Sequence, residues 1–103
     1  VAPDISRIRT ACWDERAIDI RYRDAAGAIT QRRVYPLAIV YIERGAALLA
    51  WCCLRQEFRK FMMWRMESAE PTDETFRPHR VRLLRDYISQ MSKEYAQDAV
   101  HKA

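Results

Sequence analysis

The chain has 103 residues, of which 50% are hydrophobic, and it carries a formal net charge of +4. This length is enough for one hydrophobic core and excludes two, and the hydrophobic content excludes a disordered chain. No segment approaches the roughly 18 uncharged apolar residues of a membrane span, so we expect one soluble, cytoplasmic domain with no membrane contact. The chain starts at Val1, without an initiator Met or a leader-like segment, which suggests a fragment or a processed product.

The cysteines and histidines favour neither a disulfide framework nor a metal site. The three cysteines are Cys12, Cys52 and Cys53, and two of them are adjacent, which is poor material for disulfides. We interpret them as small buried hydrophobes in a reducing compartment. Because His79 and His101 have no Cys-x-x-Cys partner, no metal site and no cofactor are predicted.

Residues 4–16 and 17–34 predict a helix followed by a β-hairpin. Apolar residues recur at helical spacing within residues 4–16. Residues 17–23 alternate between apolar and polar side chains, which is typical of a strand that buries one face. Gly27 lies in the predicted turn, and residues 29–34 return antiparallel.

Three more strands are expected after the hairpin. Pro36 cannot donate a ladder hydrogen bond, so it indicates an edge or a bend. The predicted strands cover residues 38–42, 46–54 and 58–66. Five strands with a helix at each end predict a mainly β fold, a small antiparallel barrel that is closed or nearly so.

The end of the chain predicts a second helix. Residues 67–78 contain two prolines and are expected to be irregular or extended. The helix that follows has an apolar stripe formed by Val81, Leu84, Ile88, Met91 and Tyr95. We expect this stripe to be too long for a small barrel to cover, so that part of it packs against a second subunit in a homodimer.

Positive charge is concentrated in the middle of the chain. Residues 16–65 hold nine Arg and one Lys against four acidic residues. On a continuous strand over residues 58–66, Arg59, Phe61 and Arg65 would share one face. Such a face can hold phosphate by guanidinium hydrogen bonds and stack a base. A strong Arg bias also arises from a GC-rich genome without any functional cause.

Catalysis has little support in the sequence. It contains no Gly-rich phosphate loop, no nucleophile elbow and no paired histidine. No catalytic residue is predicted, and we expect a binding protein rather than an enzyme.

The order of several motifs resembles the WYL domain of bacterial transcriptional regulators with a DeoR-type winged helix-turn-helix. The resemblance runs from Ile5 to Phe76. Its motifs are Ile20-Arg21-Tyr22-Arg23-Asp24, Arg33-Val34-Tyr35-Pro36-Leu37, Leu48-Leu49-Ala50-Trp51-Cys52, Leu54-Arg55 and Phe58-Arg59-Lys60-Phe61, followed by Arg65-Met66. Two positions depart from the family: the Trp-Tyr-Leu signature falls on Ala46-Ala47-Leu48, and Trp64 replaces an Asp.

The resemblance implies that the barrel is Sm-like or SH3-like and that it forms an effector-sensing domain over residues 1–78, with a helical extension at 79–103. It implies a nucleotide or single-stranded nucleic acid as effector, operator DNA bound through a domain missing upstream, and a homodimer. The ligand-binding residues carried over from the motifs are Tyr22, Arg55, Arg59, Phe61 and Arg65, with Arg33 in second rank. The effector itself, the regulated genes and the direction of regulation do not follow from the sequence.

Each predicted site residue also has a structural interpretation. Tyr22 and Phe61 are equally suited to a core position, and Arg59 can pair with Glu57. The alternative function is a dimerisation or interaction module that uses the barrel and the carboxy-terminal helix, in which the lost aromatics at Ala46-Ala47 mark a degenerate ligand site. A second expectation concerns the ligand: Arg59 and Arg65 on one strand would lie about 20 Å apart, which favours an extended ligand such as a short oligonucleotide.

Overall fold

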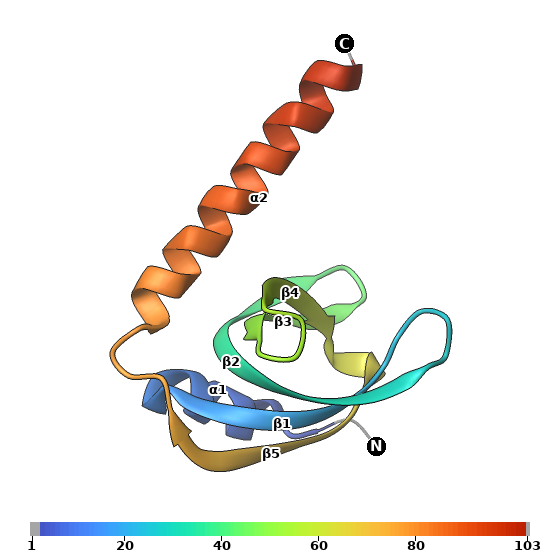
Figure 1. Cartoon of the computed structure of the whole chain (residues 1–103). Coiled ribbons are helices and arrows are strands. Elements are labelled where there is room, and N and C mark those ends of the chain that lie inside the picture. The colour runs from blue at the N-terminus through green and yellow to red at the C-terminus, as the bar shows by residue number, and fades with distance from the viewer. Residues whose placement is uncertain (1–2, 103) are drawn as a thin grey trace.

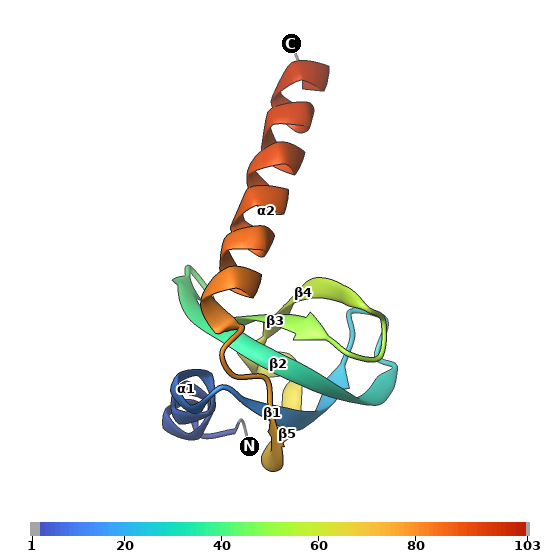
Figure 2. The same ribbon diagram turned by 60° about the vertical axis from the view of Figure 1, so that its left-hand side comes forward.

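The computed structural model describes residues 3–102, and the side chains of residues 3–98. The elements are α1 (Ile5–Asp14), β1 (Arg16–Arg23), β2 (Ile29–Ile42), β3 (Gly45–Cys52), β4 (Glu57–Met62), the 3-10 helix η1 (Met63–Arg65), β5 (Met66–Thr75) and α2 (Arg80–Lys102). The strands form one curved antiparallel sheet, and α2 projects away from it (Figures 1 and 2).

The sheet is open. Its strand order is β4-β3-β2-β1-β5, so β4 and β5 are the two edge strands. The prediction of a mainly β, antiparallel fold with a helix at each end is confirmed, whereas a closed barrel is not. The chain passes from β4 to β5 through η1, and β5 then pairs with β1 rather than with β4 in the described part of the chain.

One strand, β2, replaces two predicted ones. The sequence predicted separate strands on either side of Pro36, but β2 runs through this residue. The pairing of β1 with β2 ends at Ile18 and Val34, and Pro36 pairs with Ala50 of β3. The missing N–H of Pro36 therefore lies beyond the end of the β1 pairing, where it removes no ladder hydrogen bond.

The prediction of one strand over residues 58–66 is correct as far as Met62 and wrong beyond it. The chain turns there into η1, which contains Arg65. The segment expected to be irregular or extended begins with the ten-residue strand β5. β5 is linked to β1 by side chains as well as by the backbone: Glu67 of β5 accepts hydrogen bonds from Arg21 and Arg23 of β1.

The main core lies between the concave face of the sheet and α1. The face of β1 predicted to be apolar is buried through Ile18 and Ile20, and α1 adds Ile8 and Cys12. Asp4 caps α1 by accepting a hydrogen bond from the Ser6 N–H, 2.9 Å away. Burial raises the pKa of the Cys12 thiol to about 11, as expected for a structural cysteine.

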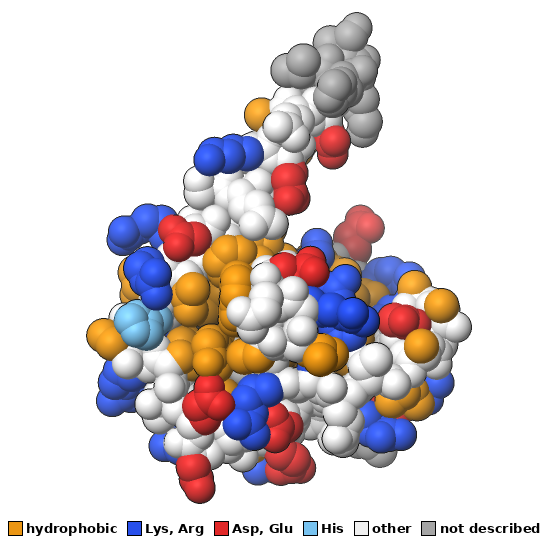
Figure 3. Space-filling view, viewed as in Figure 1, with side chains coloured by type: hydrophobic (Ala, Val, Ile, Leu, Met, Phe, Trp, Pro, Cys, Tyr) orange, Lys and Arg blue, Asp and Glu red, His pale blue; other side chains and the backbone are white. Residues whose placement is uncertain are grey.

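A second apolar cluster holds the base of α2. Leu37, Leu49, Phe76 and Tyr87 are its buried members, and Figure 3 shows hydrophobic side chains gathered where α2 meets the sheet. The predicted stripe on α2 divides into two faces. Leu84 and Met91 pack against this cluster, whereas the other members are exposed: Val81, Ile88 and Tyr95. Neither described helix is both long and apolar enough to cross a membrane.

Candidate functional site

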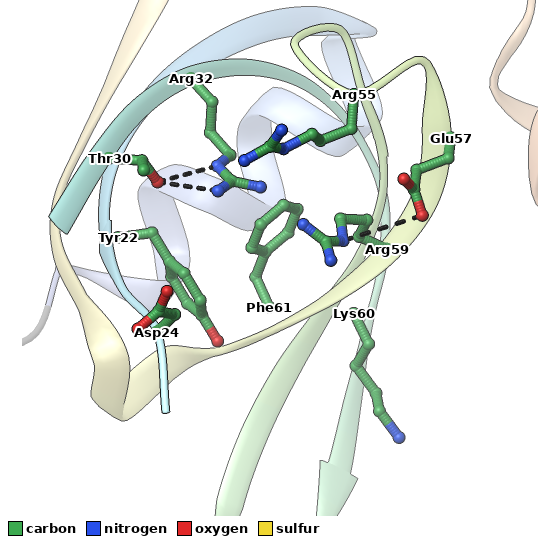
Figure 4. A pocket seen from close by; sticks show the side chains of 9 residues that line it. All are labelled: Tyr22, Asp24, Thr30, Arg32, Arg55, Glu57, Arg59, Lys60 and Phe61. Carbon is green, nitrogen blue, oxygen red and sulfur yellow. Dashed lines mark hydrogen bonds and ion pairs between the residues drawn. The ribbon is translucent and has the colours of Figure 1, made fainter. Parts of the chain in front are cut away.

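A hollow of about 490 Å³ opens beside β2, β4 and the turn that joins β3 to β4. Figure 4 shows the side chains that line it. They are Tyr22, Asp24, Thr30, Arg32, Arg55, Glu57, Arg59, Lys60 and Phe61. The guanidinium groups of Arg32, Arg55 and Arg59 converge near the Phe61 ring, whereas Lys60 points away.

Arg32 is the most unusual residue of the hollow, because it is charged and only 7% exposed. β2 places it opposite Ile20 of β1, on the face that forms the core. Thr30 Oγ1 accepts hydrogen bonds from its Nη2 at 2.8 Å and its Nε at 3.2 Å, and Nη1 lies 3.7 Å from the Cys52 sulfur. Within residues 3–98, no carboxylate forms an ion pair with Arg32. A buried charge without a counterion is costly.

Arg55 and Arg59 add charge that is only weakly neutralised. Arg55 is exposed on the turn and makes no ion pair with the described carboxylates. Arg59 lies on β4, two residues before Phe61, so both side chains share a face as predicted. The closest approach of Arg59 to Glu57 is 4.0 Å, at the outer limit of an ion pair.

Phe61 and Tyr22 form the floor of the hollow. Phe61 is 2% exposed, and its ring meets the edge of Tyr22 with centroids 5.0 Å apart. The Arg32 guanidinium lies 5.5 Å from the Phe61 centroid, in a cation–π contact. The Tyr22 hydroxyl accepts a hydrogen bond from the Met62 N–H. These contacts agree with the core interpretation of both rings.

The two carboxylates of the hollow leave its field positive. One oxygen of Asp24 already accepts hydrogen bonds from the N–H groups of Ala26 and Ala28. The lining residues include these two carboxylates, Asp24 and Glu57, and four cationic side chains, of which only Lys60 points away. The arrangement suits an anion that several guanidinium groups bind together.

Two predicted site residues lie outside the hollow. Arg33 points to the opposite face of β2, where it pairs with Asp19 at 2.8 Å and Glu74 at 2.9 Å. Arg65 of η1 donates a hydrogen bond to the carbonyl oxygen of Asp24 at 3.1 Å. The prediction that Arg59 and Arg65 share one strand face is therefore wrong, because β4 ends between these two residues.

The sequence interpretation missed Arg32. Its signal is strand parity: Arg32 alternates with the same phase as Val34, which is buried, and opposite to Arg33. The positions of the family signature, Ala46-Ala47-Leu48, are buried in β3 and do not line the hollow. Among the residues that the structure describes, no group of three His, Cys, Asp or Glu side chains could hold a metal ion.

The family model of the WYL domain matches residues 3–71. The chain belongs to the WYL domain family. Among solved structures, this WYL domain is similar to proteasome accessory factor B/C (PafBC) of Arthrobacter aurescens, with a TM-score of 0.67 and 25% sequence identity. The similarity covers 73% of this chain and 12% of that chain, so the WYL domain described here spans a small part of the solved protein's length.

Proposed function

We propose that this WYL domain is the effector-sensing domain of a bacterial transcriptional regulator. In this proposal it binds a nucleotide or a single-stranded nucleic acid in the hollow, and the binding controls the attachment of a helix-turn-helix domain to operator DNA. Family membership and the similarity to PafBC support the regulatory role. The hollow with its arginines supports an anionic effector.

The buried Arg32 carries this proposal. The Arg32 guanidinium group is nearly inaccessible and lacks a carboxylate partner. An anion that enters the hollow would therefore stabilise this buried charge more than it would stabilise an exposed or already paired arginine. Arg55 and Arg59 line the same hollow and have room to turn toward the same anion. Phosphate fits this set because guanidinium groups bind its oxygens in a bidentate manner.

The positions of Arg32 and Phe61 also indicate how a ligand would bind: through its phosphate groups rather than by stacking of a base. Phe61 is covered by Arg32 and is almost fully buried, so it offers no open face for stacking a base. The binding free energy would therefore come from contacts between arginine and phosphate. One phosphate group, or neighbouring phosphates of a nucleotide or strand, suits the three converging guanidinium groups better than a ligand stretched from Arg59 to Arg65.

Fluorescence anisotropy with a labelled single-stranded oligonucleotide tests this proposal. We expect saturable binding that weakens between 50 and 200 mM salt, because bound phosphates release counterions, and we expect an unlabelled mononucleotide to compete. Arg59→Ala should weaken the binding and reduce its salt dependence. Arg33→Ala, which removes an arginine that faces away from the hollow, is the matched control and should bind as the wild type does.

Two results would contradict the proposal. One is no binding of oligonucleotide or mononucleotide at low salt by the folded wild-type domain. The other is equal loss of affinity in the Arg33→Ala and Arg59→Ala variants, which would indicate nonspecific attraction to the whole basic surface.

A further inference from the structure

A second hollow, of about 220 Å³, lies between α1 and β2 at the foot of α2. Ala38 and Ile39 of β2 contribute apolar lining, and the other side chains of interest are Arg9, Trp13, Tyr41 and Arg80. None of these residues lines the hollow around Arg32.

Two aromatic side chains at this hollow are unusually exposed. Trp13 of α1 is 71% exposed and Tyr41 of β2 is 68% exposed. Both are held by contacts with arginine. Arg9 donates a hydrogen bond of 2.6 Å to the Tyr41 hydroxyl, and the Arg80 guanidinium lies 5.4 Å from the centroid of the Trp13 ring. Arg80 is itself fixed by a hydrogen bond of 2.8 Å to the Leu37 carbonyl oxygen.

The charge of this hollow is not neutralised. Neither Arg9 nor Arg80 forms a side-chain ion pair with a carboxylate in the part of the chain whose side chains are described. The nearby Glu15 accepts a hydrogen bond from the backbone N–H of Arg80 and pairs instead with Arg77. Two arginines thus flank an apolar surface and leave a positive field around it.

We propose that this hollow is a docking site for an acidic peptide segment that carries one large apolar side chain. Tryptophan, tyrosine and arginine are the residues that most often dominate binding energy at protein interfaces. A cavity of about 150 Å³ holds a benzene ring, so the hollow takes one aromatic or leucine-sized side chain. Acidic residues on either side of that anchor would pair with Arg9 and Arg80. This role is separate from effector binding.

The experiment uses capped pentapeptides with glutamate on both sides of a central phenylalanine or leucine. The ¹⁵N-labelled domain is titrated with each peptide, and the indole N–H signal of Trp13 is followed by NMR after assignment with Trp13→Phe. Trp51 and Trp64 do not line the hollow and provide internal controls. We expect a saturable shift at Trp13 alone, with a Kd of about 1 mM or lower.

Matched peptides and variants decide the outcome. Replacing the glutamates by lysines, or the central residue by serine, should abolish the shift. Arg9→Glu should weaken binding about tenfold, whereas Arg85→Glu, an equal charge change on the exposed surface of α2, should leave it unchanged.

Four results overturn the proposal: no saturable shift with either acidic peptide, equal binding of the lysine peptide, equal binding by Arg9→Glu, or a stronger response to adenosine monophosphate than to the peptides. A shift of the Trp13 signal with the concentration of the domain alone that persists in Ile88→Ser, which alters the exposed face of α2, would identify a second copy as the occupant of this hollow and would also overturn the proposal.

Discussion

Arg32 and Arg33 are neighbours in sequence but have opposite environments. Arg33 is partly exposed and pairs with both Asp19 and Glu74, as expected for a surface arginine. Arg32 points into the concave face of the sheet and has hydroxyl and thiol neighbours in place of a carboxylate. The alternation of a β-strand produces this difference within two residues. We infer that Arg33 stabilises the fold, whereas the proposed function assigns Arg32 to the ligand.

The ion pairs of Arg33 predict how stability depends on pH. The pKa of Glu74 is lowered because Tyr35 and then Arg33 donate hydrogen bonds to its carboxylate. The pKa of Asp19 is lowered chiefly by its hydrogen bond with Arg33. Carboxyl groups whose folded-state pKa is lowered contribute stability above their unfolded-state pKa and lose it as the pH falls through the folded-state value.

We therefore expect the Tm to fall as the pH is lowered from about 5 to about 3, and to fall less in Glu74→Gln. Thermal unfolding followed by circular dichroism at several pH values provides the measurement. Glu43→Gln, which changes an exposed carboxylate of the β2–β3 turn, is the control and should keep the wild-type dependence. An identical slope in Glu74→Gln and the wild type would show that the pairing with Arg33 and Tyr35 contributes nothing.

At the scale of elements, the sequence predicted best where local periodicity decides the structure. The apolar alternation of β1 identifies the buried face through Ile20, and the turn at Gly27 has a positive φ of 92° in the structure. The sequence did not predict β5 as a strand, because this segment is acidic and its apolar and polar residues alternate only weakly. It is a strand because β1 offers it an unpaired edge and arginines for Glu67, a tertiary effect.

Placing a charge on the buried face of β1 should unfold the domain. Ile20→Asp would bury an unpaired carboxylate, at a cost of about 4 kcal/mol or more. Gln31→Asp, on the exposed face of the adjacent strand and opposite Arg21, should be tolerated. Urea unfolding followed by circular dichroism compares the two variants. Wild-type stability in Ile20→Asp would refute the core described here.

The homodimer predicted from the sequence stays a prediction, and α2 now shows how to test it. Ile88 is exposed, whereas Met91 packs against the cluster that holds α2 to the sheet. We propose that the exposed residues Val81, Ile88 and Tyr95 contact a second subunit. Ile88→Ser should then weaken self-association in sedimentation velocity without lowering the Tm, and Met91→Ser should lower the Tm. A wild-type domain that stays monomeric at all concentrations would contradict this interface.

At the scale of the whole molecule, the candidate site depends on segments that are far apart in sequence. The hairpin contributes Tyr22 and Arg32, the turn before β4 contributes Arg55, and β4 contributes Arg59 and Phe61. Motif positions indicated four of these residues. Arg32 was missed, and excluding Arg65 required the end of β4 at Met62. The alternation of residues 32–34 is a local signal for the buried side of Arg32, but the lack of a carboxylate partner for Arg32 and the end of β4 at Met62 are tertiary features that local periodicity does not give.

The proposed function requires that Arg32, although buried, binds an anion. Arg32→Met retains an unbranched side chain of similar length over Phe61 and removes the charge. Because an unpaired buried charge destabilises the fold, we expect the Tm of this variant to stay the same or rise by about 5 °C. We expect its affinity for the labelled oligonucleotide to fall about tenfold or more.

The most direct test measures both quantities on the same preparation of Arg32→Met and of the wild-type domain, by thermal unfolding and by fluorescence anisotropy at low salt. For Arg32→Met we expect retained or increased stability together with a loss of binding. Binding equal to that of the wild type, or a marked loss of stability that shows Arg32 to be a structural residue, would contradict it.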